Sequence, residues 1–320
     1  MSDDLESGPM SDVAQVSRRR AWVMAARPHT LPAGASPVVV GVGLALGAGT
    51  FRALPALAAL VGALLIQIGA NFANDYYDAM HGADTDEREG FTRVTQAGLI
   101  EPSSVKRATY ATFLAALLVG CYLVYVGGLP ILVVGLLSIA AGVAYTGGPL
   151  PFGYYGLGDL FVFLFFGVIA VTGTVYVQVA AAGAAFPLVP PAGSIPATAV
   201  VASLGVAGIV TNILVVNNLR DVETDRKAGK YTLAVRIGYA WSRVEYVALY
   251  ALAYAVPLWF LARPDYGLVV LLPWFSLPLA VVVSRTVLEH AEAEHLDPAL
   301  TRTGQTLALY AVLFAAGLAL

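Results

Sequence analysis

Charged residues are scarce in this sequence. Of its 320 residues, 12% are Asp, Glu, Lys or Arg, whereas 58% are hydrophobic. Between Arg107 and Arg220 the only charged residue is Asp159. A soluble globular protein typically has about 25% charged residues, so this composition excludes that class and indicates a membrane protein. The expected partner is the lipid bilayer, and no nucleic-acid partner is expected.

Other absences exclude further classes of protein. The single cysteine, Cys121, leaves no disulfide framework. Neither a Walker loop nor a Rossmann fingerprint is present, which argues against these two modes of phosphate binding. No nucleophilic triad is supported. The four histidines show no metal-binding spacing with one another and are interpreted mostly as solvated loop residues: His29, His81, His290 and His295.

The N-terminal stretch MSDDLESGPMSDVAQVS lacks the basic start and the apolar core of a signal peptide. We interpret residues 1–20 as a disordered cytosolic tail and residues 21–320 as a single transmembrane domain. Where the two meet, the stretch SRRRAWVMAARP joins basic residues to Trp22 and Met24. This combination is typical of a short helix that lies in the membrane interface.

Long apolar runs are abundant in the rest of the chain. Runs of about 17 to 25 residues, separated by charges and by Gly/Pro clusters, predict nine membrane-spanning helices. They cover residues 30–48, 53–74, 106–126, 129–146, 157–181, 196–218, 243–262, 266–286 and 304–320. The last of these is short.

Basic residues predict the orientation. With nine spans, one side of the membrane holds sixteen of the eighteen Lys and Arg residues, and the other side holds Arg52 and Arg263. The positive-inside rule then places the basic side in the cytoplasm. We therefore expect a multi-pass protein of the cell inner (plasma) membrane, with its active site facing the cytoplasm.

Two acidic motifs stand at the cytoplasmic ends of uncharged predicted helices. The first is NDYYDAMHGADTDER, from Asn74 to Arg88, and the second is NNLRDVETDRKAGKYTLAVRIG, which starts at Asn217. Asn precedes Asp by four residues in both, at Asp78 and at Asp221, so each pair shares a helical face. The motifs end the second and the sixth predicted span, which suggests a four-helix repeat that places both on the solvated rim of one cavity.

A single motif of this kind is most simply a solvated loop start, whereas two matched motifs favour a bound cation. Carboxylates at helix C-termini repel one another and oppose the helix dipole unless a cation lies among them. Oxygen ligands favour Mg²⁺ or Ca²⁺, and Mg²⁺ often combines one or two carboxylates with substrate phosphates. Nearby basic residues suit such phosphates: Arg88, Arg93, Arg220, Arg226, Lys227 and Lys230. The inferred ligand is a diphosphate with a hydrocarbon tail.

The Gly-rich connection between the fourth and fifth predicted spans, AYTGGPLPFGYYGLGD, lies on the same side. It is either a flexible hairpin or a part of the site. Tyr145, Tyr154 and Tyr155 stand close to Asp159 in this segment. Aromatic faces of this kind can stabilise a cation.

Four segments resemble the UbiA superfamily of intramembrane prenyltransferases. They are AARPHTLPAGASPVVVG, NDYYDAMHGADTDEREGFTRVTQAGLI, AYTGGP and NNLRDVETDRKAGKYTLAVRIG. Within the superfamily they look most like the 1,4-dihydroxy-2-naphthoate polyprenyltransferases of menaquinone synthesis, over nearly the whole chain after Trp22. The resemblance implies an all-α, polytopic membrane protein with nine helices in a bundle around a central cavity. It also implies Mg²⁺-dependent transfer of a polyprenyl group from polyprenyl diphosphate to 1,4-dihydroxy-2-naphthoate, with decarboxylation.

The candidate site residues fall into three groups. The catalytic residues are Asp78, Asp221 and Asp225. The metal ligands, for Mg²⁺, are Asn74, Asp78, Asp84, Asp221 and Asp225. The substrate-binding residues are Arg27, Asn71, Arg88, Arg93, Gln96, Tyr145, Asn217, Arg220 and Lys230.

The chain departs from the superfamily pattern in two places. The Asp expected four residues after Asp78 is a glycine here, so Asp84 is expected to take its place. Many relatives also carry a lysine four residues after the tyrosine that Tyr145 resembles, and this chain lacks it. We expect Lys230 or Arg93 to supply that basic contact instead.

Three alternative functions fit the sequence less well. A transporter should carry its ionisable residues near the membrane midplane, whereas here they cluster at one edge. A phosphatidyl-group transferase would show a DGxxAR pattern, which is absent. A UbiA relative with another acceptor, such as 4-hydroxybenzoate, haem or a chlorophyll precursor, remains the main alternative.

Overall fold

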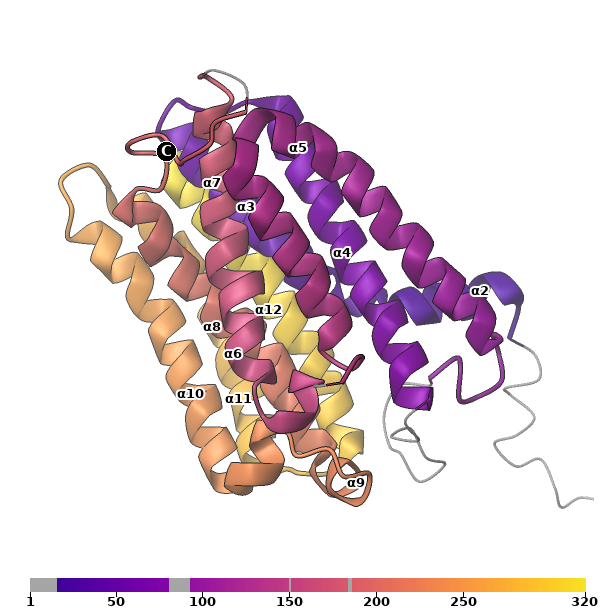
Figure 1. Ribbon diagram of the computed structural model, residues 1–320. Coiled ribbons are helices and arrows are strands. Elements are labelled where there is room, and N and C mark those ends of the chain that lie inside the picture. Colours follow the sequence, from indigo (N-terminus) through magenta and orange to yellow (C-terminus); the bar gives the residue numbers. More distant parts are fainter. Residues whose placement is uncertain (1–15, 81–92, 150, 184–185) are drawn as a thin grey trace, which may run out of the picture.

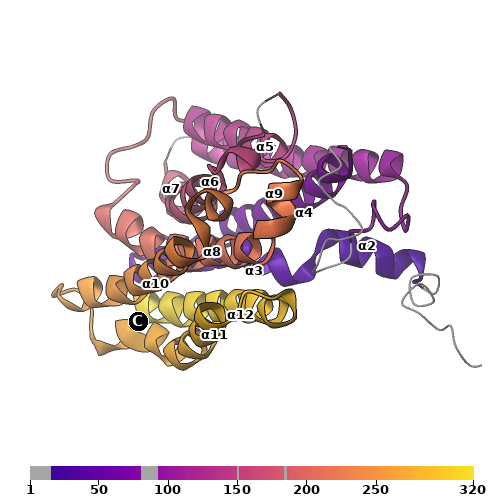
Figure 2. The same cartoon turned by 90° about the horizontal axis from the view of Figure 1, so that it is seen from below.

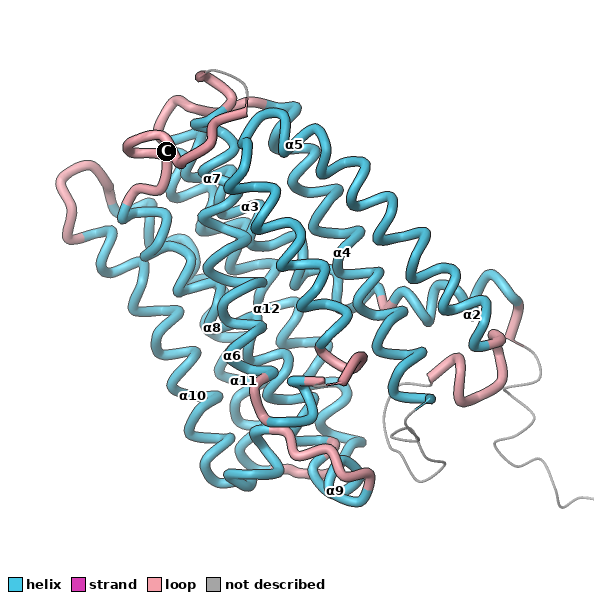
Figure 3. The backbone as a smooth tube through the Cα atoms, in the orientation of Figure 1, coloured by secondary structure: helices cyan, strands magenta, loops and turns pink. Residues whose placement is uncertain are grey.

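The computed structural model describes residues 16–80, 93–149, 151–183 and 186–320. In these ranges the chain is helical and has no strands (Figures 1 and 3). The elements are α2 (Arg18–Ala26), η1 (Pro28–Thr30), α3 (Leu31–Gly47), α4 (Ala53–Met80), α5 (Pro102–Ala144), η2 (Phe152–Tyr155), α6 (Gly158–Val162), η3 (Phe163–Ile169), α7 (Ala170–Ala180), α8 (Ala197–Arg220), α9 (Val222–Lys227), α10 (Leu233–Leu261), η4 (Leu268–Ser276), α11 (Leu277–Glu289) and α12 (Ala293–Ala319).

The helices confirm the predicted number of long segments. Seven helical segments have the length and hydropathy of a membrane span. One of them, α5, holds two predicted spans, and α12 adds another. Among the residues that the structure describes, the total is therefore nine, and the chain is an all-α, multi-pass membrane protein.

Gly128 divides α5 into the two helices predicted at 106–126 and 129–146. Its φ of 64° and ψ of −151° are not helical. The chain reverses direction within α5 (Figure 1). Two contacts show the reversal: Lys106 lies over the ring of Tyr76, and Thr146 donates to Asn74, so both ends of α5 meet the same part of α4. A Cβ at position 128 would collide with the carbonyl oxygen of Pro187, which already accepts a hydrogen bond from the amide of Leu129. Only glycine fits this turn without strain.

Three predicted boundaries were wrong. Helix α4 continues to Met80, six residues beyond the predicted end, so Asn74 and Asp78 belong to the helix itself. Helix α10 begins at Leu233 and bends at Gly238, where φ is 75°. Helix α12 begins at Ala293 and has 27 residues, about 40 Å at 1.5 Å per residue. The predicted bounds were taken from hydropathy, which falls where the polar residues begin. The helices continue into those polar residues, so their true ends were missed.

Helix α8 forms the centre of the bundle, and most of its residues are buried. The main apolar core joins it to α3, α7, α10, α11 and α12, through side chains such as Val206, Tyr254 and Phe314. When the bundle is seen from the end that carries α9, the short helix α9 lies between α5 and α12 (Figure 2). The C-terminus lies at the opposite end (Figure 1).

Candidate active site

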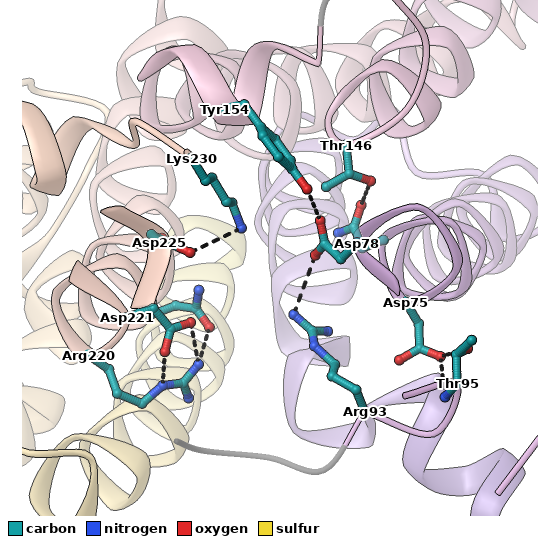
Figure 4. Close-up of polar contacts among 12 residues, drawn as sticks. Asp75, Asp78, Arg93, Thr95, Thr146, Tyr154, Arg220, Asp221, Asp225 and Lys230 are labelled. Carbon is teal, nitrogen blue, oxygen red and sulfur yellow. Dashed lines mark hydrogen bonds and ion pairs between the residues drawn. The ribbon is translucent and has the colours of Figure 1, made fainter. Parts of the chain in front are cut away.

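The first acidic motif occupies the last turns of α4. Asp78 accepts a hydrogen bond of 2.8 Å from the hydroxyl of Tyr154, and its other oxygen lies 3.7 Å from Nη2 of Arg93 (Figure 4). Asn74, one turn earlier, accepts a hydrogen bond of 3.0 Å from Thr146. These partners come from the segments on either side of α5 and from η2. They hold both α4 side chains toward the middle of the bundle.

The second acidic motif starts where α8 ends. Arg220 is the last residue of α8, and its Nε and Nη2 donate to the two carboxylate oxygens of Asp221, at 2.7 and 2.9 Å. Nη2 also donates to Oδ1 of Asn217 at 2.9 Å. On the other side of the guanidinium, Nη1 donates to Oδ1 of Asp297 at 2.7 Å. Helix α12, which carries Asp297, therefore takes part in the second motif.

Tyr154 connects the two motifs. Its hydroxyl donates to Asp78, while the ammonium of Lys230 lies 5.4 Å from the centre of its ring. That ammonium is also 3.6 Å from Oδ1 of Asp225 (Figure 4). One continuous polar group thus joins four side chains: Asp78 of α4, Tyr154 of η2, Asp225 of α9 and Lys230 after α9. The two motifs, which lie far apart in the sequence, meet at the same end of the bundle.

The acidic residues are buried, which corrects the expectation of a solvated rim. Asp78 is 2% exposed, Asp221 is 1% exposed and Asp225 is 7% exposed. The sequence could not show this, because the segments that cover the motifs are distant along the chain. A buried carboxylate needs a charged or hydrogen-bonding partner. Each of these three has a basic residue within ion-pair distance.

A cavity of about 580 Å³ opens between α4, α5, α7 and α8. One end is polar and the remainder is mostly apolar, with residues such as Leu117, Leu132 and Ile139 of α5. Nine of the candidate site residues line it: Arg27, Asn71, Asn74, Asp78, Arg93, Tyr145, Asn217, Arg220 and Lys230. The sequence analysis therefore named nine residues that line one cavity, and their roles in binding and catalysis stay predictions.

Aromatic rings form one wall of the cavity near its polar end. Phe152 stacks on Phe161, with 3.8 Å between ring centres, and Phe161 is followed by Phe165 at 5.8 Å. Tyr145 meets the edge of Phe152 at 5.5 Å. All four residues line the cavity. Tyr155, which the sequence placed with this group, is 50% exposed and is not part of the wall.

Asn71 holds the start of α3 in place. Its amide nitrogen donates to the carbonyl of Ala26 and to the hydroxyl of Thr30, both at 2.9 Å. Gln67, one turn earlier on α4, also donates to Thr30 at 3.1 Å. Between these anchors, Arg27 adopts a left-handed conformation, with φ of 50° and ψ of 69°. The network explains how Arg27 comes to line the cavity.

Some predicted residues that the structure describes do not line the cavity, and two others fall in a range that it does not describe. Asp84 and Arg88 lie outside the described residues. Gln96 does not line the cavity. Asp221 and Asp225 do not line it either, although their ion-pair partners Arg220 and Lys230 do. Two basic residues named for phosphate contact, Arg226 and Lys227, are also absent from the lining. Arg226 is half-exposed and lies 3.3 Å from Glu223.

The structure also brings together residues that the sequence analysis missed. Nδ1 of His290 and Nδ1 of His295 lie 3.8 and 4.0 Å from one carboxylate oxygen of Glu292. The imidazole rings stack with 3.9 Å between centres. Their ligand atoms lie close enough together to hold a metal ion, although the spacing of the histidines in the sequence did not indicate such a group. They come together where α11 ends and α12 begins, and a spacing rule for a single helix does not describe such a junction.

Comparisons with known proteins show the family to which the chain belongs. Residues 35–299 match the UbiA prenyltransferase family. The chain is 38% identical to the 1,4-dihydroxy-2-naphthoate octaprenyltransferase of Escherichia coli (strain K12), covering 95% of this chain and 96% of that protein. It is 35% identical to the enzyme of the same name from Mycobacterium tuberculosis, covering 93% and 96%. Identity to the Bacillus subtilis enzyme of that name is 30%, covering 91% and 90%.

Solved structures share the fold at low sequence identity. A UbiA homologue from Aeropyrum pernix K1 superposes with a TM-score of 0.66 at 14% identity, covering 88% of this chain and 95% of that one. A UbiA homologue from Archaeoglobus fulgidus, bound to GPP and Mg²⁺, gives 0.55 at 14% identity, covering 92% and 99%. Because the matched family covers more than half of the chain and the relatives match along nearly their whole lengths, this protein belongs to the UbiA prenyltransferase family.

Proposed function

We propose that this chain transfers a polyprenyl group from polyprenyl diphosphate to 1,4-dihydroxy-2-naphthoate, with loss of CO₂, to give demethylmenaquinol. The observation that carries the proposal is the similarity to three 1,4-dihydroxy-2-naphthoate octaprenyltransferases at 30 to 38% identity over more than nine-tenths of the chain. The cavity supports it, because a polar end continuous with an apolar remainder suits a diphosphate that carries a hydrocarbon tail.

The diphosphate would lie among three basic residues at the polar end. Each of them lines the cavity and is within ion-pair distance of a carboxylate: Arg93 with Asp78, Lys230 with Asp225, and Arg220 with Asp221. On binding, the basic side chains would turn donors toward phosphate oxygens, while the carboxylates would turn toward metal. This exchange keeps every buried charge paired, which removes the main cost of burying such groups.

Mg²⁺ is the proposed cofactor, and the donor set fits it. The proposed ligands offer oxygen atoms only, which Mg²⁺ prefers: Asn74, Asp78, Asp84, Asp221 and Asp225. The A. fulgidus homologue with GPP and Mg²⁺ is consistent with this choice. When bound, Mg²⁺ supplies positive charge that stabilises the departing diphosphate.

The aromatic wall would serve the next stage. When the allylic carbon–oxygen bond breaks, the electron pair leaves with the diphosphate and an allylic cation remains. The aromatic rings of Phe152, Phe161 and Phe165 line the cavity, where they would stabilise this cation. Their apolar surface would also exclude water, which would otherwise capture the cation.

The acceptor would attack through the ring carbon that bears the carboxylate. A carbon–carbon bond forms to the allylic carbon, the carboxylate leaves as CO₂, and the electron pair of the broken bond restores aromaticity. A basic residue would orient the carboxylate by a charge-assisted hydrogen bond. Arg27 and Arg93 both line the cavity. Both residues are therefore candidates for this role.

We further propose that the protein lies in the plasma membrane with this site facing the cytoplasm. The support is the distribution of basic residues, sixteen of eighteen on the side of the motifs. The water-soluble acceptor and the diphosphate head of the polyprenyl donor would then reach the polar end of the cavity from the cytoplasm.

One experiment tests the proposed reaction. Purified protein is incubated with Mg²⁺, a polyprenyl diphosphate and a panel of aromatic acceptors, of which 1,4-dihydroxy-2-naphthoate carries a labelled carboxyl carbon. We expect prenylated naphthoate and labelled CO₂ in equal amounts by mass spectrometry. Preferred prenylation of 4-hydroxybenzoate would refute the acceptor and retain the prenyl transfer. No prenylated product with any acceptor would refute the proposed function.

A further inference from the structure

Asp297 is a carboxylate on a different helix that contacts the second acidic motif. It lies in α12, 77 residues beyond Arg220, and its Oδ1 accepts a hydrogen bond of 2.7 Å from Nη1 of Arg220. The Arg220 side chain is 3% exposed and that of Asp297 is 29% exposed. Asp297 does not line the cavity, so it is not placed to touch a substrate. Its hydrogen bond to Arg220 is the contact that connects it to the second acidic motif.

The guanidinium of Arg220 is shared between two carboxylates. Asp221 takes the edge formed by Nε and Nη2, and Asp297 takes Nη1. A planar guanidinium with donors on both edges is suited to such a bridge. The local sequence alone would pair Arg220 with its neighbour Asp221, and Figure 4 shows how closely the two lie.

We infer that Asp297 is a positioning residue, which holds Arg220 so that Asp221 remains able to bind a metal ion. This inference rests on the proposed function, in which Asp221 is a metal ligand. A metal ion must compete with Arg220 for the oxygens of Asp221. With Asp297 present, the positive charge of Arg220 is divided between two carboxylates, and the three groups together carry one net negative charge. Without Asp297, Arg220 would neutralise Asp221 completely, and a cation would be attracted less strongly.

The test measures metal binding directly. Mn²⁺ is titrated into the purified full-length chain in detergent, with inorganic pyrophosphate present, and free Mn²⁺ is followed by electron paramagnetic resonance. We expect Asp297→Ala to raise the dissociation constant for Mn²⁺ about tenfold, a common size for the loss of a partner of a metal ligand. Asp297→Asn, which keeps an oxygen acceptor without the charge, should fall between wild type and Asp297→Ala.

A matched control separates positioning from a general loss of charge. Glu294→Gln removes one negative charge from an exposed position on the same helix, three residues earlier, and should change the dissociation constant less than about twofold, because exposed charges are screened. In activity assays, Asp297→Ala should raise the Mn²⁺ concentration for half-maximal rate, while kcat at saturating Mn²⁺ stays within about twofold of wild type. A merely structural defect would lower kcat instead.

A double-mutant cycle tests the route through Arg220. In an Arg220→Ala background, replacing Asp297 with Ala should have almost no further effect on Mn²⁺ binding. The inference would be overturned if the double variant showed the product of the two single-variant changes in the Mn²⁺ dissociation constant. Wild-type Mn²⁺ affinity in Asp297→Ala would overturn it as well. Failure of the wild-type chain to bind Mn²⁺ would overturn it too, and would refute the proposed metal site at the same time. Wild-type binding with an unaffected Asp297→Ala variant would refute the inference alone.

Discussion

The hydroxyl of Tyr154 donates a hydrogen bond of 2.8 Å to Oδ1 of Asp78, 76 residues away in the sequence. The contact places the Gly-rich connection against the last turn of α4. It fixes one oxygen of the carboxylate that the first acidic motif contributes to the candidate active site. The Lys230 ammonium lies over the ring of Tyr154. The contribution of the hydroxyl can therefore be tested separately from that of the ring.

Replacing Tyr154 with phenylalanine should slow the reaction. The substitution removes the hydroxyl and keeps the ring beside Lys230. A hydrogen bond to a charged group contributes about 1.5 to 3 kcal/mol, so kcat/KM for polyprenyl diphosphate should fall about tenfold to hundredfold in steady-state assays. Tyr155→Phe, at a half-exposed neighbouring position, is the control and should retain wild-type kinetics. Equal kinetics for both variants would show that the hydroxyl does not support Asp78.

Asp78→Asn and Asp221→Asn should each reduce turnover by at least about a hundredfold, because an amide is a poor ligand for Mg²⁺. Both carboxylates are buried, so alanine at either position would also leave a basic partner unpaired and destabilise the fold. The amide keeps the shape and limits this second effect. Turnover and thermal unfolding in detergent are measured together. Activity per folded molecule equal to that of wild type would rule out a role in the reaction.

Removal of divalent metal should stop the reaction. The proposed ligands offer only oxygen atoms, and the donor diphosphate needs positive charge as it departs. We expect no turnover after exhaustive chelation, and recovery when Mg²⁺ or Mn²⁺ is added back. Turnover that persists in the chelated protein would end the metal hypothesis.

Gly128→Ala should destabilise the hairpin of α5. Its φ of 64° disfavours any side chain, and a Cβ would meet the carbonyl oxygen of Pro187. Strain of this kind costs about 1 to 3 kcal/mol, which should lower the midpoint of thermal unfolding in detergent. Gly120→Ala is the matched control, because a Cβ there meets no atom within 4 Å. An unfolding midpoint of Gly128→Ala as high as that of the control would contradict the proposed role of this glycine.

Cysteine labelling should report the orientation. Tyr231, beside Lys230, and Asp265, near Arg263, are both exposed. In a Cys121→Ser background, Tyr231→Cys should be protected from an impermeant thiol reagent in intact cells, and Asp265→Cys should react. Permeabilised cells provide the control, in which both positions should be labelled. The reverse pattern in intact cells would overturn the proposed orientation.

The sequence by itself determined the fold class, and it named nine polar residues that the structure places at one cavity. Runs of apolar residues predict spans because the bilayer excludes unpaired polar groups, and this physical requirement is read directly from composition. The repeated Asn–Asp spacing identified Asp78 and Asp221, because residues four apart share a helical face. The helix number followed from the apolar runs, although α4, α10 and α12 proved longer at their polar ends.

Only the tertiary structure decided how these residues are paired and buried. Tyr154 reaches Asp78, and Asp297 reaches Arg220, across more than seventy residues. No local pattern encodes such contacts, because they depend on the packing of α12 against α8 and on the position of the connection after α5. The same packing buries carboxylates that hydropathy alone would place in solvent. Hydropathy describes each segment's preference for its surroundings, whereas burial depends on which other segments cover it.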